Sequence, residues 1–332
     1  MQAPAGAEAG GLDRKPFTHV FSVLVHENLD CVVDLIRNLR FFDPDSPIVV
    51  YDGSGGSLLL TTRALEQFGA VVHPAPKPIR WSRLHVFMFD CLEYALDRYG
   101  FDAVTVVDSD QLLVRRGYAR AVQTVLRDRP QAGVLAARHP SSGIADPSVN
   151  PIVPERTRWA PMLERFAYGG KQPLPLWVFW PGTVMTGTAS AAICDLRDDP
   201  ALAEILGKSG VASEEVVFST LAALLGYEVL ERPWNDEWVR WHRPLGSRDV
   251  AEALADPACF WLHPVRRRHD DPARSYLRGV SNEYQGFTPT PLAVQPAPAL
   301  APAPTESAAA RWKRRVIERF RPAGSDRVDT GA

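Results

Sequence analysis

Two aspartates separated by one serine, Asp108-Ser109-Asp110, directly follow an apolar run at residues 103–107. The run is long enough for one buried strand, so the two carboxylates stand at its carboxyl end. Side chains alternate along a strand, and this places Asp108 and Asp110 on one side, at the edge where open α/β sheets bind ligands. Neighbouring carboxylates repel each other and resist burial unless a cation or donor groups satisfy them. A divalent ion held against a diphosphate is one solution, and a solvated turn is the alternative.

The chain before this pair alternates between strand and helix patterns. Apolar runs predict strands at residues 20–25, 47–51, 70–72 and 103–108, and apolar residues at helical spacing predict helices at 30–42, 58–68 and 81–99. Strands that alternate with helices in this way indicate an α/β fold with a mostly parallel mixed sheet and helices on both faces. The sequence has no Gly-x-Gly-x-x-Gly motif, so a dinucleotide-binding domain is not indicated.

The chain after the pair continues in a similar way, with one interruption. Strands are predicted at residues 132–137, 176–187, 227–230 and 258–262, and helices at 118–127, 188–196 and 213–225. Residues 139–171 contain five prolines and are predicted to be rich in loops.

Composition narrows the class of protein. The chain has 332 residues, a formal net charge of -2 and 45% hydrophobic residues, which is ordinary for a soluble globular protein and gives no sign of a nucleic-acid partner. The four cysteines are far apart and form no CxxC pair, which favours buried free thiols. Neither a secretion signal nor an apolar run of membrane-spanning length is found, so we expect a cytoplasmic protein.

Both ends of the chain differ in composition from its middle. Residues 1–16 are rich in Ala, Gly and Pro and are predicted to be a disordered tail. Residues 288–308 are predicted to form a Pro/Ala-rich linker, residues 309–322 a basic amphipathic helix, and residues 323–332 a second disordered tail. The basic helix suits a weak peripheral contact with an anionic membrane surface, and the alternative is a helix surrounded by solvent.

Four features together resemble a nucleotide-sugar glycosyltransferase of the GT-A fold over about residues 17–280. These are the strand-helix-strand opening, the Asp52-Gly53-Ser54 loop after the second strand, the Asp108-Ser109-Asp110 turn, and a late histidine, His263, followed by Arg266 and Arg267. The resemblance implies one Rossmann-like GT-A domain at residues 17–287. It also implies a nucleoside-diphosphate sugar donor and Mn²⁺ or Mg²⁺ as the cofactor.

The resemblance assigns roles to individual residues of the donor site. It places Asp52 on the base or ribose of the donor, and His26 in the same site. It makes Asp108 and Asp110 the residues that hold the metal against the diphosphate, with Asp110 as a direct ligand. His263 is then the third metal ligand, and the alternative for this residue is a histidine packed in the core.

A looser similarity concerns the core-2/I-branching N-acetylglucosaminyltransferases. It rests on residues 22–26 and 33–39, and on the helix that starts Ser213-Glu214-Glu215. It implies that Glu215, with Glu214 as the second choice, is the catalytic base, and the alternative is helix capping. Those enzymes bind the diphosphate through basic side chains without a metal, and the similarity gives this role to Arg266 and Arg267. This chain therefore has both a candidate metal site, at Asp108 and Asp110, and a candidate basic site for the diphosphate.

The expected activity is transfer of a sugar to a hydroxyl of a glycan, lipid or small-molecule acceptor, metal-dependent and inverting. The alternatives are a retaining enzyme, a nucleotidyltransferase and a non-catalytic binding module. A nucleotidyltransferase would show a glycine-rich loop with Arg or Lys after the first strand, and residues 26–29 here read His-Glu-Asn-Leu. Five tryptophans could form the floor of an acceptor site: Trp177, Trp180, Trp234, Trp238 and Trp241.

Overall fold

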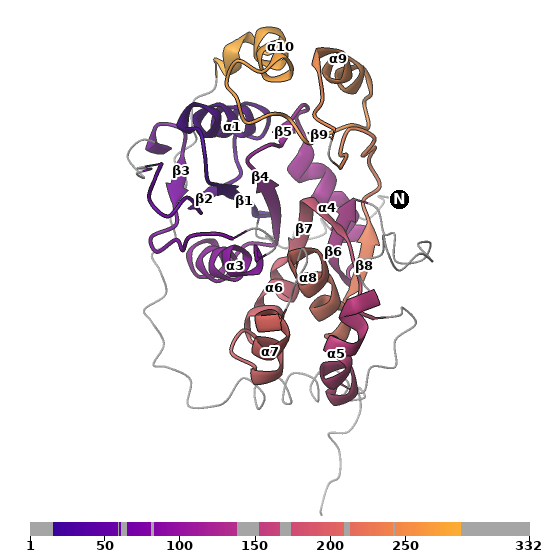
Figure 1. Cartoon of the computed structure of the whole chain (residues 1–332). Helices are drawn as coiled ribbons and strands as arrows, with labels where there is room; N and C mark the ends of the chain where they lie inside the picture. The colour runs from indigo at the N-terminus through magenta and orange to yellow at the C-terminus, as the bar shows by residue number, and fades with distance from the viewer. Residues whose placement is uncertain are drawn as a thin grey trace, which may run out of the picture.

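The computed structural model describes residues 16–58, 60, 65–80, 83–137, 153–166, 174–208, 213–241 and 243–286. A seven-stranded sheet with the order β3-β2-β1-β4-β7-β6-β8 forms its centre (Figure 1). The strands are β1 (His19–Val25), β2 (Ile48–Asp52), β3 (Ala70–Val72), β4 (Ala103–Asp108), β6 (Ala132–Ala137), β7 (Phe179–Thr186) and β8 (Glu228–Glu231). Neighbours are parallel except where β7 pairs with β4 and β6. The mostly parallel mixed sheet of an α/β fold is thereby confirmed.

Helices cover both faces of this sheet. They are α1 (Leu29–Phe42), α3 (His85–Tyr99), α4 (Tyr118–Asp128), α5 (Val153–Arg165), α6 (Gly187–Cys194), α7 (Pro200–Lys208), α8 (Ser213–Leu224), α9 (Ser247–Ala255), α10 (Pro272–Val280) and the short 3₁₀ helix η2 (Asn282–Tyr284). Figure 1 shows α1 and α3 on opposite sides of β1 and β2. Helices α6 and α8 pack beside α3.

The two central strands explain where charged residues are tolerated. All seven residues of β1 are buried, and so are the first five residues of β4. A parallel strand covered on both faces needs an almost continuous apolar sequence, because a charge there would lose its water without gaining a partner. The carboxylates of these strands therefore stand at the last residue, Asp108 on β4, which is partly exposed, and Asp52 on β2, which is buried but accepts the N–H of Ser54.

A second, two-stranded sheet joins distant parts of the chain. Strand β5 (Leu112–Leu113), just after the Asp-Ser-Asp turn, pairs antiparallel with β9 (Trp261–Leu262), with Leu112 opposite Leu262. The side chain of Asn38 on α1 binds both the N–H and the C=O of Leu113, each at 2.8 Å. The small sheet is thus anchored to α1, and it brings the residue after Leu262 beside the turn.

Several predicted elements differ from the structure. The segment expected to be loop contains α5, whose buried Trp159 and Met162 belong to the core although Pro161 lies inside the helix. Helices α7, α9 and α10 were not predicted, and α3 begins at His85 rather than at residue 81. The strand predicted at residues 176–187 is limited to 179–186. Residues 59 and 61–64 of the helix predicted at 58–68 lie outside the described residues, and only the end of this segment, at residues 65–66, is helical among the described ones.

The predicted tails, Pro/Ala linker and basic amphipathic helix also lie outside the described residues, apart from residue 16. Within the described part of the chain, no helix has the length and apolar character needed to cross a membrane.

Candidate functional site

The turn between β4 and β5 presents two carboxylates at the carboxyl edge of the sheet. Gln111 closes this turn, because its backbone N–H donates to the carbonyl of Asp108 at 3.0 Å and its side-chain oxygen accepts from the Asp108 N–H at 2.7 Å. The predicted strand end is therefore also the site of a tight, hydrogen-bonded turn. Asp108 and Asp110 are partly exposed, as expected of residues that leave a buried strand.

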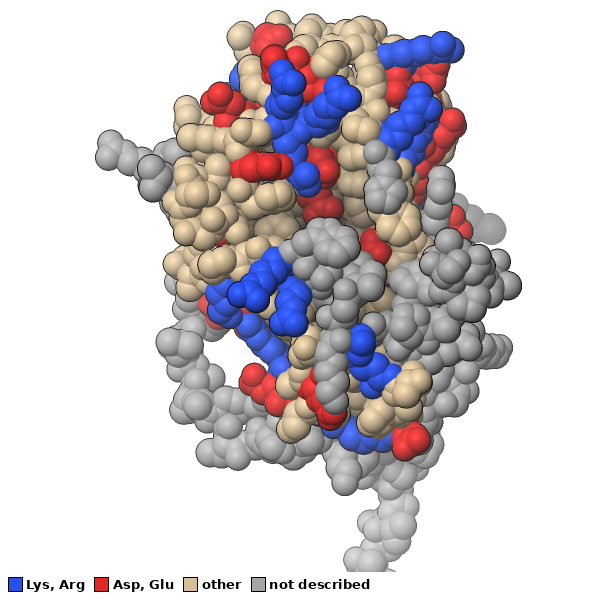
Figure 2. All heavy atoms as spheres, viewed as in Figure 1, with Lys and Arg blue, Asp and Glu red and all other residues tan. Residues whose placement is uncertain are grey.

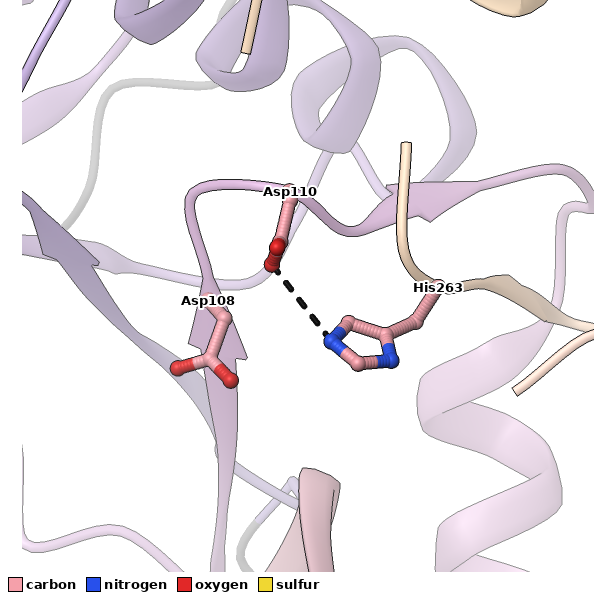
Figure 3. Close-up of side chains that lie close together, drawn as sticks. All are labelled: Asp108, Asp110 and His263. Atoms are coloured by element: carbon pink, nitrogen blue, oxygen red, sulfur yellow. Dashed lines mark ion pairs between the residues drawn. The ribbon is translucent and has the colours of Figure 1, made fainter. Parts of the chain in front are cut away.

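His263 joins these two carboxylates. It follows β9 directly, and the N–H of Val265 donates to the carbonyl of Asp110 at 2.8 Å. One ligand atom from each of Asp108, Asp110 and His263 lies within 4.8 Å of the others, and His263 Nε2 is 3.5 Å from Asp110 Oδ1. Figure 3 shows Asp110 directed from the turn toward the imidazole ring, with Asp108 beside them at the end of β4. The three residues predicted to surround one ion are therefore brought together.

The hydrogen bond on the far side of the ring prepares His263 for metal binding. His263 Nδ1 lies 2.9 Å from the carbonyl oxygen of Arg240, which can only accept, so Nδ1 carries a proton. Burial lowers the pKa of His263, which favours the neutral ring. In that form Nε2 has a free lone pair facing Asp110, and a metal-bound histidine commonly donates its other N–H to a backbone carbonyl in this way.

The donor set of this cluster fits a metal ion. Within the described residues, the buried Oδ1 atom of Asp110 has no hydrogen-bond donor. A buried carboxylate oxygen without a donor is costly, and a cation beside it removes that cost. Two carboxylates and a neutral imidazole are suitable ligands for a divalent ion. The cluster of Asp108, Asp110 and His263 could therefore hold a metal ion.

Burial and the charge of Asp110 raise the pKa of Asp108 to about 7, although Arg267 opposes the rise. Without a cation, Asp108 thus gains a proton as pH falls through about 7. Metal binding requires the carboxylate form, so a bound ion would displace this proton.

Of the two predicted basic residues, Arg267 contacts the cluster. Its Nη2 lies 3.0 Å from Asp110 Oδ2, and its Nε lies 3.3 Å from Glu27 and donates to the Ser109 hydroxyl at 2.6 Å. The Arg266 side chain is exposed and forms no ion pair with the described residues. On the face of the molecule drawn in Figure 2, acidic side chains are set back near the middle, below a group of Lys and Arg side chains.

His26 lies near this cluster but is not part of it. It follows β1 and is exposed, and its ring is 3.7 Å from Glu27. Partial burial of the ring lowers the pKa of His26, the charge of Arg267 lowers it further, and the charges of Glu27 and Asp110 oppose the fall. His26 is therefore close enough to sense the charges around Asp110.

Asp52 lies at the same edge of the sheet but further away. It ends β2, which is separated from β4 by β1, a distance of about 10 Å for two strand spacings. Its Oδ1 accepts the N–H of Ser54 at 2.9 Å. Asp52 thus shapes its own loop, at the same edge of the sheet as Asp108.

The two predicted glutamates open α8 beside the start of β7. Because β7 runs antiparallel to β4, its first residues lie at the carboxyl edge, and the N–H of Val178 donates to the carbonyl of Glu215 at 3.0 Å. Both glutamate side chains are buried. Trp177 Nε1 donates to Glu215 Oε2 at 2.5 Å, and the N–H of Leu84 donates to Glu214 at 3.4 Å.

A fully buried arginine that sequence reasoning missed holds the site together. Arg274 on α10 pairs with Asp34 of α1 at 2.9 Å and donates to the carbonyls of Ser109 at 2.8 Å and Arg266 at 2.9 Å. It therefore links α1, the Asp-Ser-Asp turn and the loop after His263. The signal that could have revealed α10 is Asp271 followed by proline, a capping residue with proline at the first helical position.

Replacing Arg274 with methionine is expected to lower the free energy of unfolding by about 3–5 kcal/mol, the cost of removing one member of a buried, hydrogen-bonded ion pair. Asp34 would keep its 3.1 Å ion pair with Arg278 but lose its 2.9 Å ion pair with Arg274. Urea denaturation measures this loss. The control is Arg248→Met, which removes an exposed pair with Glu252 and should leave the transition unchanged. Equal midpoints for the two variants would contradict the role of Arg274.

Glu215 should make stability depend on pH. Burial raises its pKa from 4.5 to about 8, with Trp177 opposing the rise and Glu214 adding to it. Between these pH values the folded protein keeps a proton that the unfolded chain has released, so the free energy of unfolding falls as pH rises. The test is to measure the melting temperatures of wild type and Glu215→Gln in chelator at several pH values, because glutamine has no carboxyl proton to lose. A difference in melting temperature between the two proteins that stays constant from pH 4.5 to 8 would contradict the raised pKa.

The fold and the site together define an α/β protein with a candidate metal centre at the carboxyl edge of its sheet. No protein-family model matches the chain, and no curated protein matches it. The function is therefore inferred from the chemistry of the site.

Proposed function

We propose that this protein is a glycosyltransferase of the GT-A fold that moves a sugar from a nucleoside-diphosphate sugar to an acceptor hydroxyl. The observation that carries the proposal is the cluster of Asp108, Asp110 and His263, with ligand atoms within 4.8 Å of one another. It lies where open α/β sheets bind ligands, in contact with a cation, Arg267, and close enough to a buried carboxyl group, Glu215, for the charge of Asp108 to add to the rise that burial causes in the pKa of that group. This combination suits a reaction that must neutralise a leaving diphosphate and deprotonate an acceptor.

The leaving nucleoside diphosphate gains negative charge as the bond to the sugar breaks. A Mn²⁺ or Mg²⁺ ion held by Asp108, Asp110 and His263 would supply Lewis-acid neutralisation of that charge. Arg267 lies against Asp110 and has guanidinium N–H groups suited to binding phosphate oxygens, so it orients the diphosphate and stabilises its charge. Arg266, exposed on the same loop, is close enough in sequence to assist once a donor is present.

The acceptor hydroxyl must lose its proton as it attacks the sugar. Glu215 is the proposed base, and the Trp177 indole N–H donates to its Oε2 at 2.5 Å, which holds the carboxyl group in place. Burial raises the pKa of Glu215 to about 8, so nearby positive charge is needed to favour the carboxylate at neutral pH. A base on the face opposite the diphosphate gives inversion, and a retaining reaction is the alternative.

Two alternative functions would use a similar set of residues at this edge of the sheet. A nucleotidyltransferase would need cationic and glycine residues in the loop after β1, where this chain has His26, Glu27, Asn28 and Leu29. A binding module without turnover would not need a buried carboxyl group next to the ligand edge. The glycosyltransferase function accounts for the cluster, Arg267 and Glu215 together.

A donor panel tests the proposal. UDP-, GDP- and dTDP-sugars are incubated with the full chain and a mixture of sugar and lipid acceptors, with Mn²⁺, with Mg²⁺ or with chelator. We expect one nucleotide class to raise the melting temperature in the presence of metal and to release nucleoside diphosphate. Stabilisation without release points to a binding module. Pyrophosphate release from a nucleoside triphosphate and a sugar phosphate points to a nucleotidyltransferase.

A further inference from the structure

The most exposed of the large hydrophobic side chains in the described residues is Trp241, at 57%. It does not stand alone. Its ring centroid lies 6.2 Å from that of Trp177, with 31° between the planes, and 6.3 Å from that of Phe179. We call Trp177, Phe179 and Trp241 the aromatic wall. Trp177 and Phe179 are buried, so Trp241 is the exposed end of the wall.

The aromatic wall connects the two chemical groups of the proposed reaction. At one end, Trp177 donates its indole N–H to Glu215. At the other end, the Phe179 ring meets the His263 ring edge to face, with centroids 5.6 Å apart. An exposed tryptophan on this wall is therefore adjacent to both the proposed base and the metal cluster.

The backbone holds Trp241 in this place. The N–H of Arg240 donates to the carbonyl of His263 at 2.8 Å, and the N–H of Arg243 donates to the carbonyl of Trp241 at 2.9 Å. Residue 239 also forms a bridge with His263. A rigid aromatic surface next to a few polar groups is typical of a small-molecule site, because little conformational freedom is lost when a ligand binds.

The other tryptophans expected at an acceptor floor lie elsewhere. Trp180 packs against Phe218, and Trp234 against Tyr118 and Phe260, within the core. Trp238 is buried as well. Of the five tryptophans, Trp177 and Trp241 belong to the site.

We propose that the aromatic wall, through Trp241, is a stacking surface for a sugar ring of the acceptor, and that this ring places its hydroxyl at Glu215. The inference rests on the proposed function and narrows its acceptor to a carbohydrate. One face of a pyranose presents C–H groups with partial positive charge, which suit the negative face of an indole. Its hydroxyls remain free at the ring edge, where the carboxyl group of Glu215, held against Trp177, supplies a hydrogen-bonding partner.

This chemistry favours a sugar over a lipid chain. A chain would need a continuous apolar groove, whereas the wall ends at carboxyl groups on one side and at His263 on the other. Burying an alkyl chain there would also remove water from those polar groups without replacing their hydrogen bonds.

Saturation-transfer NMR tests the stacking surface without any donor. The probes are methyl β-D-glucopyranoside, methyl β-D-galactopyranoside, N-acetylglucosamine and hexanol, added to the full chain with diamagnetic Mg²⁺. We expect saturation of the ring C–H protons of at least one sugar, with an affinity about tenfold weaker in Trp241→Ala and partly restored in Trp241→Phe. The control is Tyr276→Ala, which removes another exposed aromatic ring and should bind like wild type.

The outcomes separate this inference from the proposed function. Sugar binding that depends on Trp241, without nucleoside diphosphate release from any donor, supports the stacking surface and overturns the transferase. Donor turnover with an acceptor KM that Trp241→Ala leaves unchanged overturns the stacking surface and keeps the transferase. Saturation of hexanol but of no sugar also overturns it.

Discussion

Replacement of Asp110 with asparagine is expected to lower nucleoside diphosphate release by about 10³-fold, the rate equivalent of several kcal/mol of lost charge stabilisation. Asparagine keeps the size of the side chain but removes the negative charge. The oxygen that faces His263 at 3.5 Å is the one without a hydrogen-bond donor, so it is the atom that a cation would need. Steady-state release with the donor found in the panel measures the effect, and calorimetric titration with Mn²⁺ measures the loss of binding.

The control for this variant is Asp128→Asn, which removes an exposed carboxylate at the end of α4. It should release nucleoside diphosphate and bind Mn²⁺ like wild type. In wild type, Mn²⁺ binding should strengthen as pH rises through about 7, because burial and the charge of Asp110 raise the pKa of Asp108 to about 7 and Asp108 must lose its proton before it can bind the ion. Undiminished Mn²⁺ binding by a folded Asp110→Asn protein would show that the ion does not bind here.

Replacement of Glu215 with glutamine should lower turnover by about 10²- to 10⁴-fold while donor binding persists. Glutamine fills the same space and can still accept the Trp177 N–H, but it cannot take a proton. The loss should therefore appear in kcat, and the donor Kd from a thermal-shift titration should remain near the wild-type value. A folded variant with wild-type kcat would show that Glu215 is not the base.

Glu214→Gln is the matched comparison, because it removes the neighbouring buried carboxyl group on the same helical turn. In wild type the Glu214 carboxylate accepts the N–H of Leu84 at 3.4 Å and is not bonded to Trp177, so we expect a smaller loss of turnover for Glu214→Gln. A larger loss for Glu214→Gln would move the base by one residue. If neither variant slows the reaction and the product keeps the anomeric configuration of the donor, the enzyme is retaining.

Local sequence patterns were sufficient where the cause of a structure is local. The apolar runs of β1 and β4 predict buried strands because a central parallel strand tolerates few polar residues. Proline was misleading in α5, where Pro161 is accommodated because Trp159 and Met162 on the same helix are buried in the core. Tertiary packing outweighs local propensity in such a helix.

The sequence by itself determined the order of the sheet elements before Asp108 and the position of two carboxylates at a strand end, because strand periodicity and turn chemistry act over a few residues. Only the tertiary structure decided that His263 faces Asp110, since this depends on the pairing of Leu112 with Leu262 across a long stretch of chain. It also decided that Arg267 rather than Arg266 contacts the cluster, and that Trp241 is exposed. Long-range contacts such as those of Arg274 set these positions, and no local pattern encodes them.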